Sequence, residues 1–427
     1  MQRGLVRRSL AGGRLRAGSV GSMQSRLIYG EQRGRRGVRP LRSLEMPRFN
    51  AVGTLILMCA VYFAAGLALA AIGPNMTALA LNIAQDVALV GSIFTSFSIG
   101  TVIVQLFAPH LSSRYGQRTL LALGACCMGS GILGESLSRS LISLLSFALL
   151  GGVGFGAILA AGSVLIPRLF GPRGASALNL VNLFFGVGSI IGPLIAGWSQ
   201  ARGGSSLLAL WVGAGLLLLL LPLISRAAET ASGGNTVPMG SATPPWSLVV
   251  LLGLMLLVYS GTEIAIGGWA AVYLERGAAM TPEHAAFALS GFWLALTLGR
   301  GLGALLGLRL SALKLLGMAG TLLLSGAILF ALSIGDAPRS VFALLIIGLA
   351  GGPIFPTIMA LVASVTKGRG AATSLALGIG NWGGALIPPA MGIVLSEWGP
   401  PAGAQMVLGL SLGVSLLLGL VVWRTLR

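Results

Sequence analysis

The sequence predicts an all-α membrane protein with twelve transmembrane helices arranged as two six-helix bundles. Of its 427 residues, 55% are hydrophobic and only 9% are charged, and the mean hydropathy is +0.91. Soluble domains carry about 25% charged residues, so this composition excludes a soluble protein. The 65 glycines suit helices that pack closely in lipid, where small residues let two backbones approach each other.

Twelve segments are long and apolar enough to cross a bilayer, which takes about 20 residues in a helix. Charges, prolines and polar clusters separate these segments from one another. They cover residues 51–73, 88–109, 119–136, 140–166, 175–198, 206–225, 247–274, 285–305, 312–334, 340–365, 371–396 and 403–423.

The charges in the loops give the orientation. If both termini are cytoplasmic, the only acidic residue in the inner loops and tail is Glu229. The basic residues there are Arg114, Arg118, Arg168, Arg173, Arg226, Arg309, Lys314, Lys367, Arg369, Arg424 and Arg427. The outer loops mix both signs, with Asp86, Glu135, Glu275, Glu283, Asp336 and Glu397 against Arg139, Arg202, Arg276 and Arg339. This asymmetry follows the positive-inside rule, and we expect a multi-pass protein of the inner (plasma) membrane.

The chain divides into four regions. Residues 49–225 and 247–427 form the two predicted bundles, and residues 226–246 form a polar cytoplasmic linker. Residues 1–48 hold twelve arginines against Glu31 and Glu45, and this composition predicts disorder. Three interpretations of this extension remain open: a tail attracted to anionic lipid, an organellar targeting segment, or an untranslated stretch before a start at Met46. Nucleic-acid binding is not expected, because no aromatic residues alternate with the arginines before Tyr29.

The two predicted bundles resemble each other in sequence. Tyr62 to Gly66 in the first span matches Tyr259 to Glu263 in the seventh, 197 residues later. The glycine clusters at 151–155 and 351–355 match at a spacing of 200, and those at 186–189 and 378–381 at a spacing of 192. Parallel repeats of this kind place a solute site where the two halves meet, near the bilayer midplane. In this alignment Gly66 is the counterpart of Glu263.

Glu263 is the main candidate for chemistry, because it is the only charge between Trp246 and Tyr273. An ionised carboxylate in the middle of a span costs several kcal/mol or more. It could bind a proton, bind a cation or accept hydrogen bonds from a solute. The structural alternative is a protonated carboxyl that bonds a neighbouring helix.

Other polar and aromatic residues within the spans are candidate solute ligands. The amides are Asn179, Asn182, Asn381 and Gln105, which offer donors and acceptors that match hydroxyl groups; their alternative role is to join helices. The aromatic candidates are Trp382, Tyr259 and Trp269, which could stack on a sugar ring; Trp269 could instead belong to the interfacial aromatic belt. Arg300 either snorkels to the cytoplasmic surface or pairs within the cavity. Helix rise separates it from Glu263 by about 10 Å along the membrane normal, so a direct ion pair between these two residues is not predicted.

Several motifs resemble the major facilitator superfamily, and the resemblance covers residues 49–427. The segment from Ser113 to Arg118 resembles the signature loop between the second and third helices, which implies gating roles for Arg114 and Arg118, with Arg300 as a further gating candidate. Three helices resemble those of the fucose-permease-like sugar symporters. The matching segments are Tyr259 to Tyr273, Asn179 to Pro193 and Gly352 to Thr357.

Two departures limit what this resemblance implies. Ser113 stands where the superfamily's loop has an aspartate. The first and fourth helices contain no acid, although fucose-type symporters use one in each. Their mode of proton coupling therefore cannot be transferred to this chain.

We expect a monomeric secondary active transporter that moves a small polar solute, a sugar in the first instance, by alternating access coupled to H⁺ or Na⁺. The alternative is a drug or metabolite efflux transporter of the same superfamily. An enzyme is not expected, because the sequence has no catalytic triad, HExxH motif or paired intramembrane aspartates. The cysteines and histidines lack metal-site spacing, so no metal or cofactor is expected. A transport-dead sensor is a third possibility.

Overall fold

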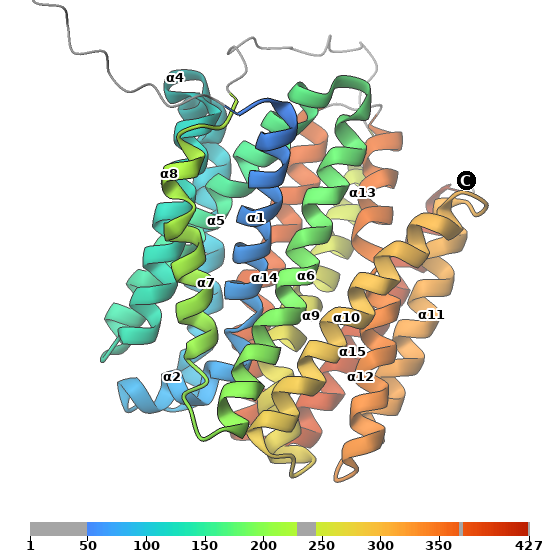
Figure 1. The fold of residues 1–427 in the computed structure, drawn as a ribbon. Coiled ribbons are helices and arrows are strands. Elements are labelled where there is room, and N and C mark those ends of the chain that lie inside the picture. The colour runs from blue at the N-terminus through green and yellow to red at the C-terminus, as the bar shows by residue number, and fades with distance from the viewer. Residues whose placement is uncertain (1–48, 229–244, 367–369, 426–427) are drawn as a thin grey trace, which may run out of the picture. The chain divides into compact units, whose positions relative to one another are not determined.

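The computed structural model describes residues 49–228, 245–366 and 370–425. The predicted N-terminal extension and most of the predicted linker lie outside these residues, as do Glu229, Lys367, Arg369 and Arg427. Within the described residues, the regular structure is entirely helical (Figure 1).

The first part of the described chain runs from α1 to α8. Its elements are α1 (Ala51–Ala70), η1 (Gly73–Asn75), α2 (Met76–Ile83), α3 (Val87–Val90), α4 (Ser92–Leu137), α5 (Leu141–Phe170), η2 (Gly171–Arg173), α6 (Gly174–Ala201), α7 (Leu208–Leu219) and α8 (Leu221–Ile224). The second part holds α9 (Trp246–Gly277), α10 (Pro282–Gly307), α11 (Ala312–Ala331), α12 (Ala337–Gly351), α13 (Ile354–Val365), α14 (Gly370–Glu397) and α15 (Gly399–Thr425).

Each of the twelve predicted spans falls on a helix or a pair of consecutive helices. In the described chain, ten helical segments are long and apolar enough to cross a membrane, which confirms an integral, multi-pass protein. The segment Leu208–Ile224 is shorter, and α14 lies outside those ten. The count of twelve crossings therefore stays a prediction.

Local sequence explains where the helices start and turn. The side chain of Asn50 accepts a hydrogen bond from the backbone amide of Gly53 at the start of α1. Ser140 and Ser143 form a capping box at the start of α5. Within α4 the chain turns at Gly116, whose φ of 83° favours glycine. The turn divides α4 into the predicted second and third spans.

Glycines set the closest helix contacts, and these contacts recur in the two predicted halves. A Cβ on Gly188 of α6 would lie 2.0 Å from the carbonyl oxygen of Phe63 in α1, and one on Gly383 of α14 would lie 2.0 Å from that of Leu257 in α9. The same packing therefore joins α1 to α6 and α9 to α14. These contacts align Phe63 with Leu257, a spacing of 194, at which Leu69 would be the counterpart of Glu263. This spacing differs by three residues from the sequence match, because glycine-rich helices align at several offsets.

Hydrogen bonds between several elements connect the predicted halves. The hydroxyl of Thr95 on α4 donates to the carbonyl of Ala385 on α14 at 2.7 Å, and that of Ser290 on α10 donates to the carbonyl of Ile190 on α6 at 2.6 Å. Ser396 also donates to Asp86 at 3.1 Å. We call the interface between the two predicted halves the seam. These contacts close the seam at the end of the bundle that holds Asp86, which is the predicted outer end.

Toward the opposite end, α6 and α10 diverge. Gly186 of α6 faces Thr297 of α10, where a Cβ would meet the threonine hydroxyl at 2.8 Å. One and two turns further along the same face of α6, Asn182 and Asn179 are exposed, and Gly301 of α10 has no atom within 4 Å of a Cβ position. The seam is therefore open at the predicted inner end.

The described ends of the chain lie at this open end. The amide of Phe49 donates to the carbonyl of Arg226, just after α8, and Arg424 of α15 donates to Ser247 at the start of α9. The beginning of α1 lies at the upper end of the helices in Figure 1. An arrangement with both ends on one side agrees with an even number of crossings, while the cytoplasmic placement stays a prediction.

Candidate functional site

A cavity with an empty volume of about 830 Å³ lies between the two predicted halves. Its walls come from α1, α4 and α5 on one side and from α9, α10 and α14 on the other. Its polar lining consists of Ser98, Thr101, Gln105, Ser260 and Asn381. Four aromatic side chains complete it, namely Phe94, Phe97, Phe155 and Trp293. The lining residues carry no charge, so the cavity matches a neutral solute that has both hydroxyl groups and an apolar face.

Two of the predicted solute ligands meet inside this cavity. The side-chain amide of Asn381 on α14 donates to the side-chain oxygen of Gln105 on α4 at 2.9 Å. The bond joins the two halves and leaves each amide further donors and acceptors for a solute. The structure therefore places these two residues both at the lining and at the seam.

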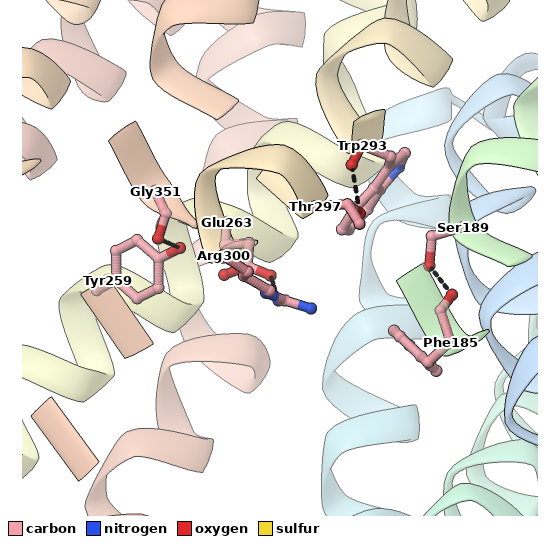
Figure 2. Close-up of polar contacts among 8 residues, drawn as sticks. All are labelled: Phe185, Ser189, Tyr259, Glu263, Trp293, Thr297, Arg300 and Gly351. Carbon is pink, nitrogen blue, oxygen red and sulfur yellow. Dashed lines mark hydrogen bonds and ion pairs between the residues drawn. The ribbon is translucent and has the colours of Figure 1, made fainter. Parts of the chain in front are cut away.

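Glu263 and Arg300 form an ion pair beside the cavity (Figure 2). A guanidinium nitrogen of Arg300 on α10 donates to a carboxylate oxygen of Glu263 on α9 at 3.1 Å. This pair was not predicted from the sequence, because helix rise measures backbone separation and ignores side-chain direction. Helical side chains lean toward the N-terminus of their own helix. Since α9 and α10 run in opposite directions, these two side chains lean toward each other.

The pair occupies a partly exposed position. The Arg300 side chain is 35% exposed and that of Glu263 is 15% exposed. In Figure 2 the guanidinium extends from α10 toward the seam, on the side where Phe185 and Ser189 of α6 lie. Glu263 itself is not among the residues that line the 830 Å³ cavity, although Ser260 and Gly267 on the same helix are. The pair therefore flanks the cavity.

Tyr259 and Trp269 are buried and use their polar atoms on backbone carbonyls. The Tyr259 hydroxyl donates to Gly351 at 2.7 Å, and the Trp269 indole donates to Pro388 at 2.8 Å. Neither side chain lines the 830 Å³ cavity. They hold α9 against α12 and α14, which positions Glu263.

Asn179, Asn182 and Trp382 lie outside the cavity. Both asparagines are exposed on the face of α6 that diverges from α10, and Trp382 is 50% exposed on α14. In the open seam, the two amides lie on the wall opposite Arg300. The structure therefore does not join them to Gln105 and Asn381 in one site.

The predicted gating loop is the turn within α4. Arg114 is exposed and its guanidinium lies 5.4 Å from the centre of the Tyr115 ring. The hydroxyl of Ser113 donates to the carbonyl of His110 at 2.8 Å, a local bond within the same helix. Arg118 lies two residues beyond Gly116 and is partly buried. The gating roles stay predictions.

Sequence reasoning missed the aromatic part of the lining and misplaced one acid. The sequence does not distinguish the cavity aromatics Phe97, Phe155 and Trp293 from other aromatic residues, because those within a span pack against lipid or protein equally well. Glu135 was expected in an outer loop, but it lies within α4 and is 1% exposed. Its position near a helix end made it resemble a loop residue.

Comparison with known proteins gives the family. The profile of the Major Facilitator Superfamily matches residues 58–388. The chain is 23% identical over 181 residues to sodium-dependent glucose transporter 1 of Rattus norvegicus, a match that covers 42% of this chain and 37% of that protein.

Solved structures show the same fold. The nucleoside transporter NupG superposes with a TM-score of 0.69 at 13% identity, over 87% of this chain and 98% of that one. The Major Facilitator Superfamily transporter FucP in the outward conformation superposes with a TM-score of 0.58 at 19% identity, over 86% of this chain and 98% of that one. The resemblance to this superfamily and its transporter fold, inferred from the motifs, is confirmed. The chain belongs to the Major Facilitator Superfamily.

Proposed function

We propose that this protein is a secondary active transporter of a small, neutral, polar solute, a sugar in the first instance. The observation that carries the proposal is the cavity between the halves, which combines uncharged hydroxyl and amide groups with aromatic rings. A pyranose presents both hydroxyl groups and an apolar face, and this lining complements both. The similarity to a glucose transporter and to the fold of a nucleoside transporter supports the same class of solute.

The seam supports alternating access as the mode of transport. Hydrogen bonds close it at the predicted outer end, and α6 and α10 diverge toward the predicted inner end. Rocking of one half against the other would exchange the two ends around a fixed cavity. The bond between Gln105 and Asn381 crosses this seam, so solute binding there would bias the movement.

Glu263 is the proposed coupling residue, with H⁺ or Na⁺ as the ion. Its carboxylate accepts a hydrogen bond from one guanidinium nitrogen of Arg300 in this conformation. A cation that entered from the open end would compete with Arg300 for the carboxylate. The released guanidinium could then donate to solute hydroxyls, so that ion and solute binding favour each other.

Uptake into proteoliposomes tests the proposal. We expect the purified protein to accumulate radiolabelled D-glucose or uridine when a proton or sodium gradient is imposed, and the collapse of that gradient to abolish accumulation. Ethidium serves as the amphipathic probe in the same vesicles. Ethidium movement without uptake of either neutral solute would contradict the proposal and favour the efflux alternative.

A further inference from the structure

A second acid lies inside the helices and forms no ion pair with the described residues, unlike Glu263. Glu135 is close to the end of α4 at Leu137 and is 1% exposed. Neither of its carboxylate oxygens has a hydrogen-bond partner among the residues that the structure describes. An ionised carboxylate in such a place is costly, and ionisable residues within spans mark ion pathways more often than packing. Glu263 differs, because Arg300 compensates its charge.

Glycines bring this carboxyl against the backbone of α5. A Cβ on Gly131 of α4 would lie 2.4 Å from the amide nitrogen of Gly151 on α5, so the two helices pack closely just before Glu135. A Cβ on Gly151 would lie 3.4 Å from the Oε1 atom of Glu135. The carboxyl therefore points back along α4 toward the middle of α5, as expected for a side chain that leans toward its own N-terminus.

One aromatic ring lies near both this carboxyl and the central cavity. The same Cβ position on Gly151 is 3.5 Å from Phe97, and Phe97 lines the cavity. The ring of Phe97 packs on Phe155, another cavity residue, at 5.6 Å between centroids. Movement of Phe97 would connect Glu135 to the water of the cavity.

The packed elements supply no charge to balance Glu135. The helices α2 and α7 contact the neighbouring Ser136 through Asn82 and Trp211, and neither helix contains an ionisable residue. The only charged residue of α5 is Arg168, in its last turn at the opposite end. Arg139 in the following connection is exposed, and the basic residues of α4 lie around its turn at Gly116. The carboxyl thus has no fixed partner for an ionised state.

We propose that Glu135 is a proton-binding site of the transport cycle. One carboxylate oxygen takes a proton from cavity water while Phe97 is displaced, and the neutral acid is then sealed in the position seen here. The reverse movement returns the proton to water in the other conformation. The inference rests on the proposed function for the role of that proton in solute transport, while proton binding itself does not depend on the solute.

Infrared difference spectroscopy on the purified protein in lipid tests proton binding without any solute. We expect a pH-dependent carboxylic-acid C=O band that disappears in Glu135→Gln and persists in Glu397→Gln, whose carboxyl is exposed on the other half. Phe97→Leu should speed the shift of this band after transfer to deuterium oxide, because a smaller side chain opens the path. A band that Glu135→Gln leaves unchanged would overturn the inference. If Glu135→Gln does not fold, a band that shifts no faster in Phe97→Leu than in the wild type would overturn it instead.

Uptake then tests the role of the proton. In proteoliposomes, Glu135→Gln should lower proton-driven accumulation of D-glucose about tenfold, the size of a typical coupling energy, and leave glucose counterflow intact. Wild-type accumulation in the variant would refute the coupling role. If the wild type moves neither glucose nor uridine under any gradient, while the band still depends on Glu135, the proposed function fails and the proton site stands.

Discussion

At the scale of single residues, the ion pair between Glu263 and Arg300 offsets the cost of placing two charges within the bundle. The two side chains come from adjacent antiparallel helices and meet at 3.1 Å. Removal of one partner leaves the other charge uncompensated in a poorly solvated place, while removal of both leaves no unpaired charge. Each of the two side chains therefore depends on the other to compensate its charge.

Thermal unfolding of three variants measures this dependence. We expect Arg300→Gln to destabilise the protein by about 1–3 kcal/mol, less than for a fully buried pair because a third of the Arg300 side chain is exposed. The double variant Glu263→Gln/Arg300→Gln should be more stable than Arg300→Gln alone. Arg309→Gln, at an exposed position, is the matched control and should change little. A double variant no more stable than Arg300→Gln alone would contradict a direct pair.

At the scale of helices, glycine positions determine how closely the spans pack. Gly383 lets α14 contact the backbone of α9, and Gly188 gives α6 the same contact with α1. These contacts hold α1, α9 and α14 in place, and all three of these helices line the cavity. The interior of α14 also contains Gly378, which has no atom within 4 Å of a Cβ position.

A pair of substitutions on one helix separates packing from helix propensity. Gly383→Ala should destabilise by about 1–3 kcal/mol or prevent assembly, because the new methyl group meets the carbonyl of Leu257. Gly378→Ala should be neutral or stabilise by up to about 1 kcal/mol, because alanine favours the helix. Thermal unfolding of both variants in detergent checks this, and equal effects would show that contact with α9 does not restrain α14.

Sequence patterns predicted the helices well and the contacts between them poorly. Runs of apolar residues located the helices, because crossing a bilayer demands such runs. The cavity amides Gln105 and Asn381 were also identified, since amides within a span need partners. The pair of Glu263 with Arg300 and the burial of Glu135 were missed, because both depend on the direction of a side chain. A residue count along the helices does not contain that information.

At the scale of the whole molecule, the structure is closed at one end and open at the other around one uncharged cavity. Thr95 and Ala385 hold the closed end, whereas Asn182 and Arg300 lie on facing walls of the open end. Transport requires the closed contacts to break and the open walls to meet. The ion pair lies where the walls diverge, so its rearrangement would report directly on this movement.

Transport by Glu263→Gln tests the central claim most directly, because glutamine keeps the shape of the side chain and removes its charge. In proteoliposomes, the wild type should accumulate D-glucose or uridine against its concentration under an imposed ion gradient. The variant should lose this accumulation and retain counterflow, which needs movement of the loaded carrier but no coupling ion. Concentrative uptake by the variant at the wild-type level would contradict the account.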